Sequence, residues 1–179
     1  MARLNFAYGS NLLPERLHAR VPQARLISNG QLTGWRFALN IRSADGSAKA
    51  TAMRTGRLDD VLHGVIYELD AAGKAMLDGY EDVGGAYRIE HATAETNAGP
   101  REIYLYVGNE SRAAEGLAPY DWYLGFIRAG ARQRGLPQAF LELLGATRSM
   151  PDRNAERSQA NWLVIPKALR QVAAAVTRL

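Results

Sequence analysis

A run of short strand patterns between residues 25 and 69 constrains the fold of this chain more than any other feature. Four segments there have the composition of β-strands: 25–28, 31–41, 49–56 and 61–69. Turn residues separate them, at Asn29-Gly30, Asp45-Gly46 and Asp59-Asp60. Strands that follow one another through turns form a meander and not an alternating parallel sheet. We therefore expect an α+β domain built on a small, mixed, barrel-like sheet with inserted and flanking helices.

Helical patterns are inserted among these strands and follow them. Asp70 is a suitable N-cap for a short helix, and Gly84-Gly85 would end that helix. A hairpin is expected next, from residues 86–93 and 101–107, with a turn around residues 97–100. After a surface loop over residues 108–118, helices are predicted at 119–134, at 137–144 and, beyond a polar loop that runs through residue 154, from residue 166 onward.

Length and hydrophobic content suit one folded domain. The 179 residues are 47% hydrophobic, which is enough to bury a core, and no repeat or linker divides residues 1–179. No apolar run approaches the roughly 20 residues that cross a bilayer. Met1-Ala2-Arg3 leads into a strand and not into an apolar secretory segment, so we expect a cytoplasmic protein with no membrane partner.

The residue types argue against several classes of function. The chain has no cysteine, and its three histidines are scattered without ligand spacing, so we predict no metal and no redox chemistry. The formal net charge of +4 raises the question of a nucleic-acid partner. However, the arginines are spread from Arg3 to Arg178 without an interleaved set of aromatic stacking residues, and we expect none.

The link between the first strand and the first helix is a candidate anion-binding turn. Leu4, Phe6 and Tyr8 alternate as in a half-buried strand, and the helix begins at Pro14. Glycine lets a main chain approach a ligand closely, and the unpaired N–H groups at a helix start point toward an anion placed there. Residues 9–11, Gly-Ser-Asn, could equally be ordinary helix-capping residues.

Glu81 is the candidate acid of the sequence. It lies at the C-terminal end of the short predicted helix, where the helix dipole disfavours a negative charge and favours the protonated carboxyl. Such a group can act as a base near neutral pH, and the two glycines beyond it would permit a turn into a cleft. The alternative is a solvated acid like its neighbours Asp78 and Asp82.

Several aromatic and basic residues allow a structural explanation. Tyr120, Trp122, Tyr123 and Phe126 have helical spacing and would fill the core, although a buried tyrosine hydroxyl still needs a partner such as a substrate. The same two explanations, core packing or a hydroxyl that contacts a substrate, apply to Tyr87. Arg128, Arg132 and Arg134 are most simply a solvated helix face.

Three segments, in this order, resemble the γ-glutamylcyclotransferase family, including its AIG2-like and γ-glutamylamine cyclotransferase relatives. Phe6-Ala7-Tyr8-Gly9-Ser10-Asn11-Leu12 resembles the substrate loop of the family. Leu77-Asp78-Gly79-Tyr80-Glu81-Asp82-Val83 resembles the segment that carries its catalytic glutamate. Tyr123, before Gly130-Ala131 and Gly135-Leu136-Pro137, resembles a substrate-contacting tyrosine. The resemblance covers residues 3–145, and residues 147–179 are an unmatched C-terminal extension.

The resemblance implies an enzyme without a cofactor. The α-amine of a γ-glutamyl compound attacks its own side-chain carbonyl, and 5-oxoproline and an amine or amino acid are released. Glu81 would be the catalytic acid and base, and Tyr123 would orient Glu81 or the substrate. Tyr8, Gly9, Ser10, Asn11 and Leu12 would bind the substrate. A homodimer is compatible with the family.

Departures from the family pattern leave parts of this interpretation open. The interval from Glu81 to Tyr87 is one residue shorter than in the animal enzymes, so Tyr87 receives no definite role. Asn11 before Leu12 disfavours glutathione as the substrate, because the glutathione-specific branch has a Tyr-Gly-Ser-Leu pattern. The identity of the γ-glutamyl substrate and of the leaving amine stays open.

Two alternatives of other classes remain at this point. The first is a non-catalytic module that senses or carries a γ-glutamyl or other acidic metabolite. The second is an interaction protein that uses the last helix, where Leu169, Val172, Val176 and Leu179 recur at helical spacing. This apolar stripe could also pack on its own domain.

Overall fold

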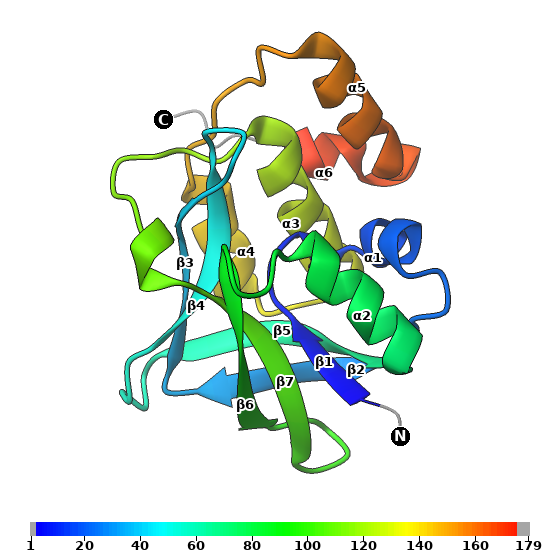
Figure 1. Ribbon diagram of the computed structural model, residues 1–179, viewed down its shortest axis with the longest axis vertical. Coiled ribbons are helices and arrows are strands. Elements are labelled where there is room, and N and C mark those ends of the chain that lie inside the picture. Colours follow the sequence, from blue (N-terminus) through cyan, green and yellow to red (C-terminus); the bar gives the residue numbers. More distant parts are fainter. Residues whose placement is uncertain (1–2, 175–179) are drawn as a thin grey trace.

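A computed structural model describes residues 3–174 as an α+β fold around a five-stranded sheet (Figure 1). The strand order is β2-β5-β1-β7-β6. The bounds are β1 Arg3–Ala7, β2 Arg25–Thr33, β5 Val61–Leu69, β6 Tyr87–Ala94 and β7 Arg101–Gly108. β1 and β7 are parallel and the other pairs are antiparallel, so the sheet is mixed as expected.

The sheet is barrel-like because its two edges curl toward each other. Gln31 of β2 and Glu95, just after β6, exchange two main-chain hydrogen bonds of 3.0 Å. A separate hairpin of β3 (Trp35–Arg42) and β4 (Ala48–Arg54) rises from the sheet (Figure 1). Gly46, with a φ of 82°, forms its turn at the predicted Asp45-Gly46 position. The fold class is therefore confirmed.

The helices flank the sheet on several sides. Their bounds are α1 Pro14–Arg20, α2 Ala71–Tyr80, α3 Asp121–Gln133, α4 Gln138–Ala146, α5 Ala155–Val164 and α6 Arg170–Ala174, with single 3₁₀ turns at Ser10–Leu12, Glu110–Arg112 and Lys167–Leu169. Asp70 caps α2 as predicted and accepts a hydrogen bond of 2.7 Å from Gly73 N. No helix among residues 3–174 is long and apolar enough to cross a bilayer.

The predicted turn at Asn29-Gly30 is wrong, because both residues lie inside β2 and pair with Val65 and Gly64 of β5. The strand ends instead at Gly34, whose φ is 81°. The Asn29 side chain donates a hydrogen bond of 2.8 Å to Arg134 O, the carbonyl at the end of α3. Here a long-range contact overrides the local preference of asparagine and glycine for turns.

Three other expectations need correction. α2 ends at Tyr80, before the two glycines, and α5 occupies a segment for which no helix was predicted. Arg128 is not on a solvated face: its residue is 5% exposed, and its guanidinium donates hydrogen bonds of 3.0 Å to Leu144 O and Thr147 O. These carbonyls lie at the C-terminal end of α4, where the regular helical hydrogen bonds stop, and the buried cation binds them.

The apolar stripe of the last helix is described only in part. Ala173 of α6 is fully buried, and Leu169 packs against the same core. These contacts agree with packing on its own domain. Val176 and Leu179 lie outside the described residues.

Candidate active site

The turn after β1 is held in place by the packing of its small residues. A Cβ atom at Gly9 would lie 3.2 Å from Ala50 Cβ and 3.5 Å from the Tyr123 hydroxyl. Leu12 N donates a hydrogen bond of 2.9 Å to Gly9 O, which closes the 3₁₀ turn. Among residues 3–174, the N–H groups of Gly9 and Ser10 donate to no acceptor. They are thus available to an anion.

Glu81 lies directly opposite this turn and is fixed by two side chains. It follows the last residue of α2, and its carboxylate is 16% exposed. Asn11 Nδ2 donates to Glu81 Oε1 at 2.9 Å, and Arg20 Nη1 donates to the same oxygen at 3.0 Å. Arg20 also donates to Asn11 Oδ1 at 3.2 Å, which closes a triangle of three residues.

This arrangement argues against Glu81 being an ordinary solvated acid. The Asn11 amide and the Arg20 guanidinium hold Oε1 in one position. Both hydrogen bonds go to Oε1, and no group among residues 3–174 donates to Oε2. The second oxygen is therefore free to exchange a proton with a ligand.

Three tyrosines beside Glu81 are anchored to β4. Tyr123 Oη accepts a hydrogen bond of 3.0 Å from Ala50 N, and Tyr87 donates one of 2.8 Å to Ala50 O. The Tyr8 hydroxyl accepts from Ala52 N at 3.0 Å and donates to Tyr106 O. Burial raises the pKa of all three tyrosines, so they remain neutral.

The tyrosines differ in what they can offer a ligand. Tyr8 and Tyr87 already donate their hydroxyl protons to main-chain carbonyls. The Tyr123 hydroxyl donates to no acceptor among the described residues, so its proton is available to a ligand. Leu12 lies apart from the other predicted site residues: its side chain is fully buried in the core and lines neither cavity near Glu81.

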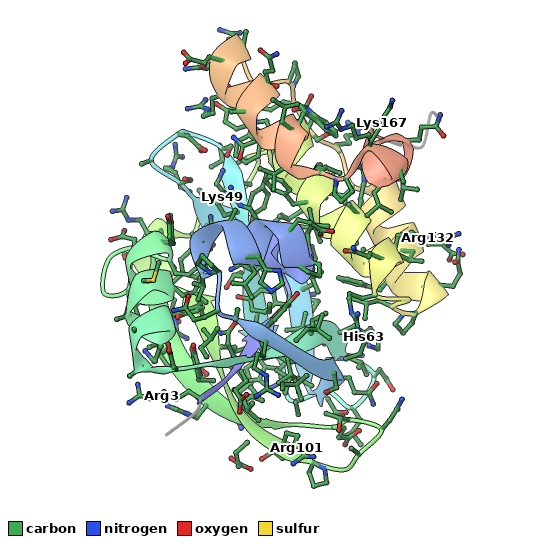
Figure 2. All side chains as sticks on the ribbon, turned by 90° about the vertical axis from the view of Figure 1, so that its right-hand side faces the viewer. Arg3, Lys49, His63, Arg101, Arg132 and Lys167 are labelled. Atoms are coloured by element: carbon green, nitrogen blue, oxygen red, sulfur yellow. The ribbon has the colours of Figure 1, made fainter. Side chains whose placement is uncertain are left out.

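Glu81 faces a cavity of about 320 Å³ and a smaller one of about 40 Å³. Ser10, Glu81, Tyr87 and Tyr123 line both. The larger cavity is rich in basic side chains, namely Arg16, Arg20, Arg42, Lys49 and Arg112. Of the basic residues labelled in Figure 2, Lys49 lines this cavity, whereas Arg3, Arg101 and Lys167 lie toward the edges of the molecule.

The sequence interpretation missed all of these cations. Arg16 and Arg20 are four residues apart on α1 and so lie on one helix face, which was a usable signal. Burial and the charge of Arg20 lower the pKa of Arg16 to about 10. No comparable signal marks Lys49, because the β3–β4 hairpin brings it to the site. Residues 3–174 contain no group of three or more histidine, aspartate or glutamate residues that could hold a metal ion.

Comparison with known proteins identifies relatives of the chain. The AIG2-like family matches residues 61–144, which include Glu81 and Tyr123. The gamma-glutamylcyclotransferase of Homo sapiens is 32% identical over 153 residues, which cover 80% of this chain and 77% of the relative. That of Mus musculus is 32% identical over 155 residues, with the same coverage of 80% and 77%.

Solved structures agree with these relatives in fold. A gamma-glutamyl cyclotransferase superposes with a TM-score of 0.77 at 23% identity, over 97% of this chain and 98% of the other. A yeast cyclotransferase described as specific to glutathione has a TM-score of 0.59 at 12% identity, over 80% and 93% of the two chains. At these identities the likeness concerns the fold alone.

Proposed function

The chain belongs to the gamma-glutamylcyclotransferase family, and on that premise we propose that it closes a γ-glutamyl group into 5-oxoproline. The departing group is an amine or an amino acid. No water enters the reaction: the bond between the γ-carbonyl carbon and the leaving nitrogen breaks as the bond to the α-nitrogen forms. The observation that carries the proposal is Glu81: Asn11 and Arg20 fix its Oε1, and none of the described residues donates to its Oε2.

Ring closure first needs a neutral α-amine, and Glu81 is suited to provide it. Oε2 accepts a proton from the α-ammonium, and the same carboxyl group then gives a proton to the leaving nitrogen. Acid–base catalysis of this kind contributes about 10²–10⁴-fold to a rate. Holding the chain of the substrate curled contributes more, because well-oriented intramolecular attack has an effective molarity of about 10⁵ M or above.

The turn after β1 and the basic side chains of the larger cavity are suited to bind the negative charges of the substrate. The free N–H groups of Gly9 and Ser10 are suited to the oxyanion that develops on the γ-carbonyl. Arg16 lines the cavity, and its Nε has no partner among the described residues, so it is our candidate for binding the α-carboxylate. The Tyr123 hydroxyl is a further donor toward the substrate.

The first test is an assay of 5-oxoproline release with Glu81→Gln, using a panel of γ-glutamyl amino acids, γ-glutamyl amines and glutathione. We expect turnover to fall by about 100-fold or more, because the amide cannot exchange the proton. Glu68→Gln is the matched control, since Glu68 pairs with Arg25 at 2.7 Å on β5 and lines neither cavity.

The outcomes separate this proposal from the alternative. Activity of Glu81→Gln within tenfold of wild type would show that Glu81 is not the acid and base. Tight binding of one substrate by the wild-type protein without any product would instead support a non-catalytic sensor of γ-glutamyl compounds.

A further inference from the structure

Lys49 is a buried cation at the wall of the larger cavity that the proposed reaction does not use. Its side chain is only 15% exposed. The ammonium donates hydrogen bonds of 2.8 Å to Asp45 Oδ2 and 2.7 Å to Ser47 Oγ. An ammonium has three N–H donors, so one is left for a further acceptor.

Three aromatic rings surround the same ammonium. Lys49 Nζ lies 4.7 Å from the ring centroid of Tyr123, 5.0 Å from that of Trp122 and 5.6 Å from that of Tyr120. Such contacts orient a cation and exclude water from it. Burial lowers the pKa of Lys49, so this cation has lost much of its hydration. An additional anion would restore the lost stabilisation.

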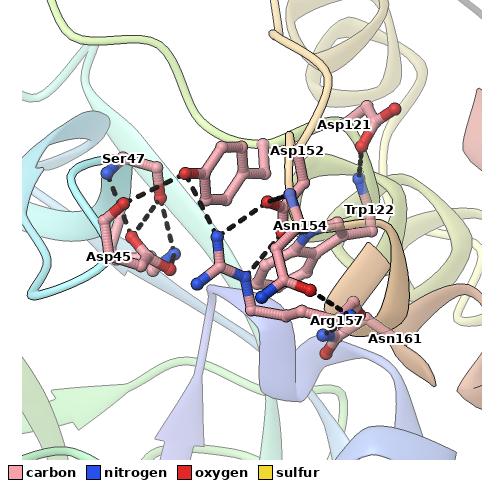
Figure 3. Close-up of polar contacts among 10 residues, drawn as sticks. Asp45, Ser47, Asp121, Trp122, Asp152, Asn154, Arg157 and Asn161 are labelled. Carbon is pink, nitrogen blue, oxygen red and sulfur yellow. Dashed lines mark hydrogen bonds and ion pairs between the residues drawn. The ribbon is translucent and has the colours of Figure 1, made fainter. Parts of the chain in front are cut away.

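Asp45, the ion-pair partner of Lys49, is held in place by further hydrogen bonds (Figure 3). Ser47 donates to Asp45 Oδ1 through both its main-chain N–H, at 3.0 Å, and its hydroxyl, at 2.7 Å. The Tyr120 hydroxyl donates to Asp45 O at 3.0 Å. The position of the ammonium therefore does not depend on the flexibility of the lysine side chain alone.

The C-terminal segment beyond residue 147 supports this end of the cavity. The Asp152 carboxylate has no exposed area and accepts hydrogen bonds from Trp122 Nε1 at 2.9 Å and Arg157 Nε at 2.6 Å. Arg157 Nη2 in turn donates to the Tyr120 hydroxyl at 3.3 Å. Trp122 and Tyr120, two of the three rings around Lys49, are thus held in place by hydrogen bonds with Asp152 and Arg157 (Figure 3).

Tyr123 connects Lys49 with the site of ring closure. Its hydroxyl lies beside Gly9 of the turn, and its ring lies next to the Lys49 ammonium. In a γ-glutamyl amino acid, one carbon separates the departing nitrogen from a carboxylate. A substrate whose γ-carbonyl lies at the turn would extend that carboxylate past Tyr123.

We infer that Lys49 is a specificity-determining residue, whose ammonium binds the carboxylate of the departing amino acid. This inference rests on the proposed function. It means that the enzyme prefers γ-glutamyl amino acids to γ-glutamyl alkylamines, which lack the carboxylate. Arg42 and Arg112 on the same cavity wall add charge of the same sign.

The test compares γ-glutamylalanine with γ-glutamylethylamide, which differ only in the carboxylate of the leaving group. In Lys49→Met, we expect KM for γ-glutamylalanine to rise about tenfold or more, because a charged hydrogen bond is lost. We expect kcat to stay within about threefold, and the kinetics with γ-glutamylethylamide to stay near wild type. Lys49→Arg, which keeps the charge, should retain most of the preference.

Lys74→Met is the matched control for removing a buried lysine. Lys74 pairs with Asp78 at 2.6 Å, is 12% exposed and lies 5.2 Å from the Tyr104 ring, but it lines neither cavity. Lys74→Met should keep the wild-type preference for γ-glutamylalanine over γ-glutamylethylamide.

Each other result has a distinct meaning. The inference is overturned if Lys49→Met affects both substrates equally, or if the wild-type enzyme handles both equally well. Absence of turnover of either substrate by the wild-type enzyme would contradict the proposed function itself.

Discussion

Arg20 is the side chain that joins the two halves of the candidate site. It contacts Glu81 at the end of α2 and Asn11 in the turn before α1 with the same nitrogen. Its guanidinium also lies 5.1 Å from the Tyr80 ring centroid, so its position is fixed from a third side. One residue therefore fixes the carboxylate relative to the turn.

Replacing Arg20 by methionine should impair catalysis without unfolding the protein. We expect kcat to fall about tenfold to 100-fold, because Glu81 loses its fixed position. Steady-state kinetics and urea unfolding of wild type and variant would measure the loss of kcat and the retained stability.

Arg25→Met provides the comparison, because Arg25 forms an ion pair with Glu68 but its side chain is 75% exposed. Exposed pairs of this kind contribute little. A kcat of Arg20→Met equal to that of wild type would mean that Arg20 does not hold Glu81 in position for catalysis.

Among the elements, α3 supports the turn after β1 through a close contact at Gly130. A Cβ atom there would overlap Leu13 N and Leu12 C, so the helix and the turn would have to separate. Tyr123, two helical turns earlier, presents its hydroxyl on the same side, beside Gly9. The same helix thus sets both the position of the main chain at the site and one donor to the ligand.

Gly130→Ala should therefore reduce both stability and activity. We expect the free energy of unfolding to fall by about 1–3 kcal/mol, as is typical of overpacking, and kcat/KM to fall with it. Gly79→Ala is the control, because a Cβ at Gly79 in α2 meets nothing within 4 Å. Alanine there should be neutral or stabilise by up to about 1 kcal/mol.

Urea unfolding and 5-oxoproline release, measured on both glycine variants, would decide this point. If Gly130→Ala is as stable and active as wild type, the close contact between α3 and the turn is not required for the site.

For the whole molecule, Asp152 and Arg157 hold the segment beyond residue 147 against the start of α3. Trp122 Nε1 donates to Asp152, and Arg157 donates to the Tyr120 hydroxyl. Hydrogen bonds from Arg157 and Trp122 hold the pKa of Asp152 well below its usual range. The pKa of Asp45 is lowered as well: burial favours the neutral form of Asp45, but hydrogen bonds from Lys49 and Ser47 outweigh that effect. The unfolded chain therefore binds these protons at a higher pH than the folded chain does.

Acid should consequently destabilise the protein through these two carboxylates. Their contribution is fully present above the unfolded pKa of about 4 and is lost as pH falls through the lower folded pKa. We expect the free energy of unfolding of wild type to decrease between about pH 5 and pH 2.

In Asp152→Asn, the free energy of unfolding should decrease less over this acidic pH range than in wild type, because one of the two carboxylates no longer titrates. Urea unfolding of both proteins across this pH range measures the difference. Equal slopes would mean that Asp152 does not link the folding of this chain to pH.

Features that depend on neighbouring residues were predictable from the sequence. The apolar strand β5, the Asp70 cap and the turn at Gly46 follow from residue composition and local dihedral preferences. The family resemblance added Glu81 and Tyr123, because a motif keeps the order of residues along the chain.

Other features were decided only by the tertiary structure. Asn29 and Gly30 lie in a strand because β5 and the end of α3 satisfy them, against their local preference. Arg20 meets Glu81 from 61 positions away, and the C-terminal segment reaches Trp122 from 30 positions away. The sequence determined the Asp70 cap, the Gly46 turn and the place of Glu81 at the end of α2, since those depend on short-range backbone preferences. Only the packed chain determined which charges surround that acid, because such pairing depends on distances in space that spacing along the chain does not encode.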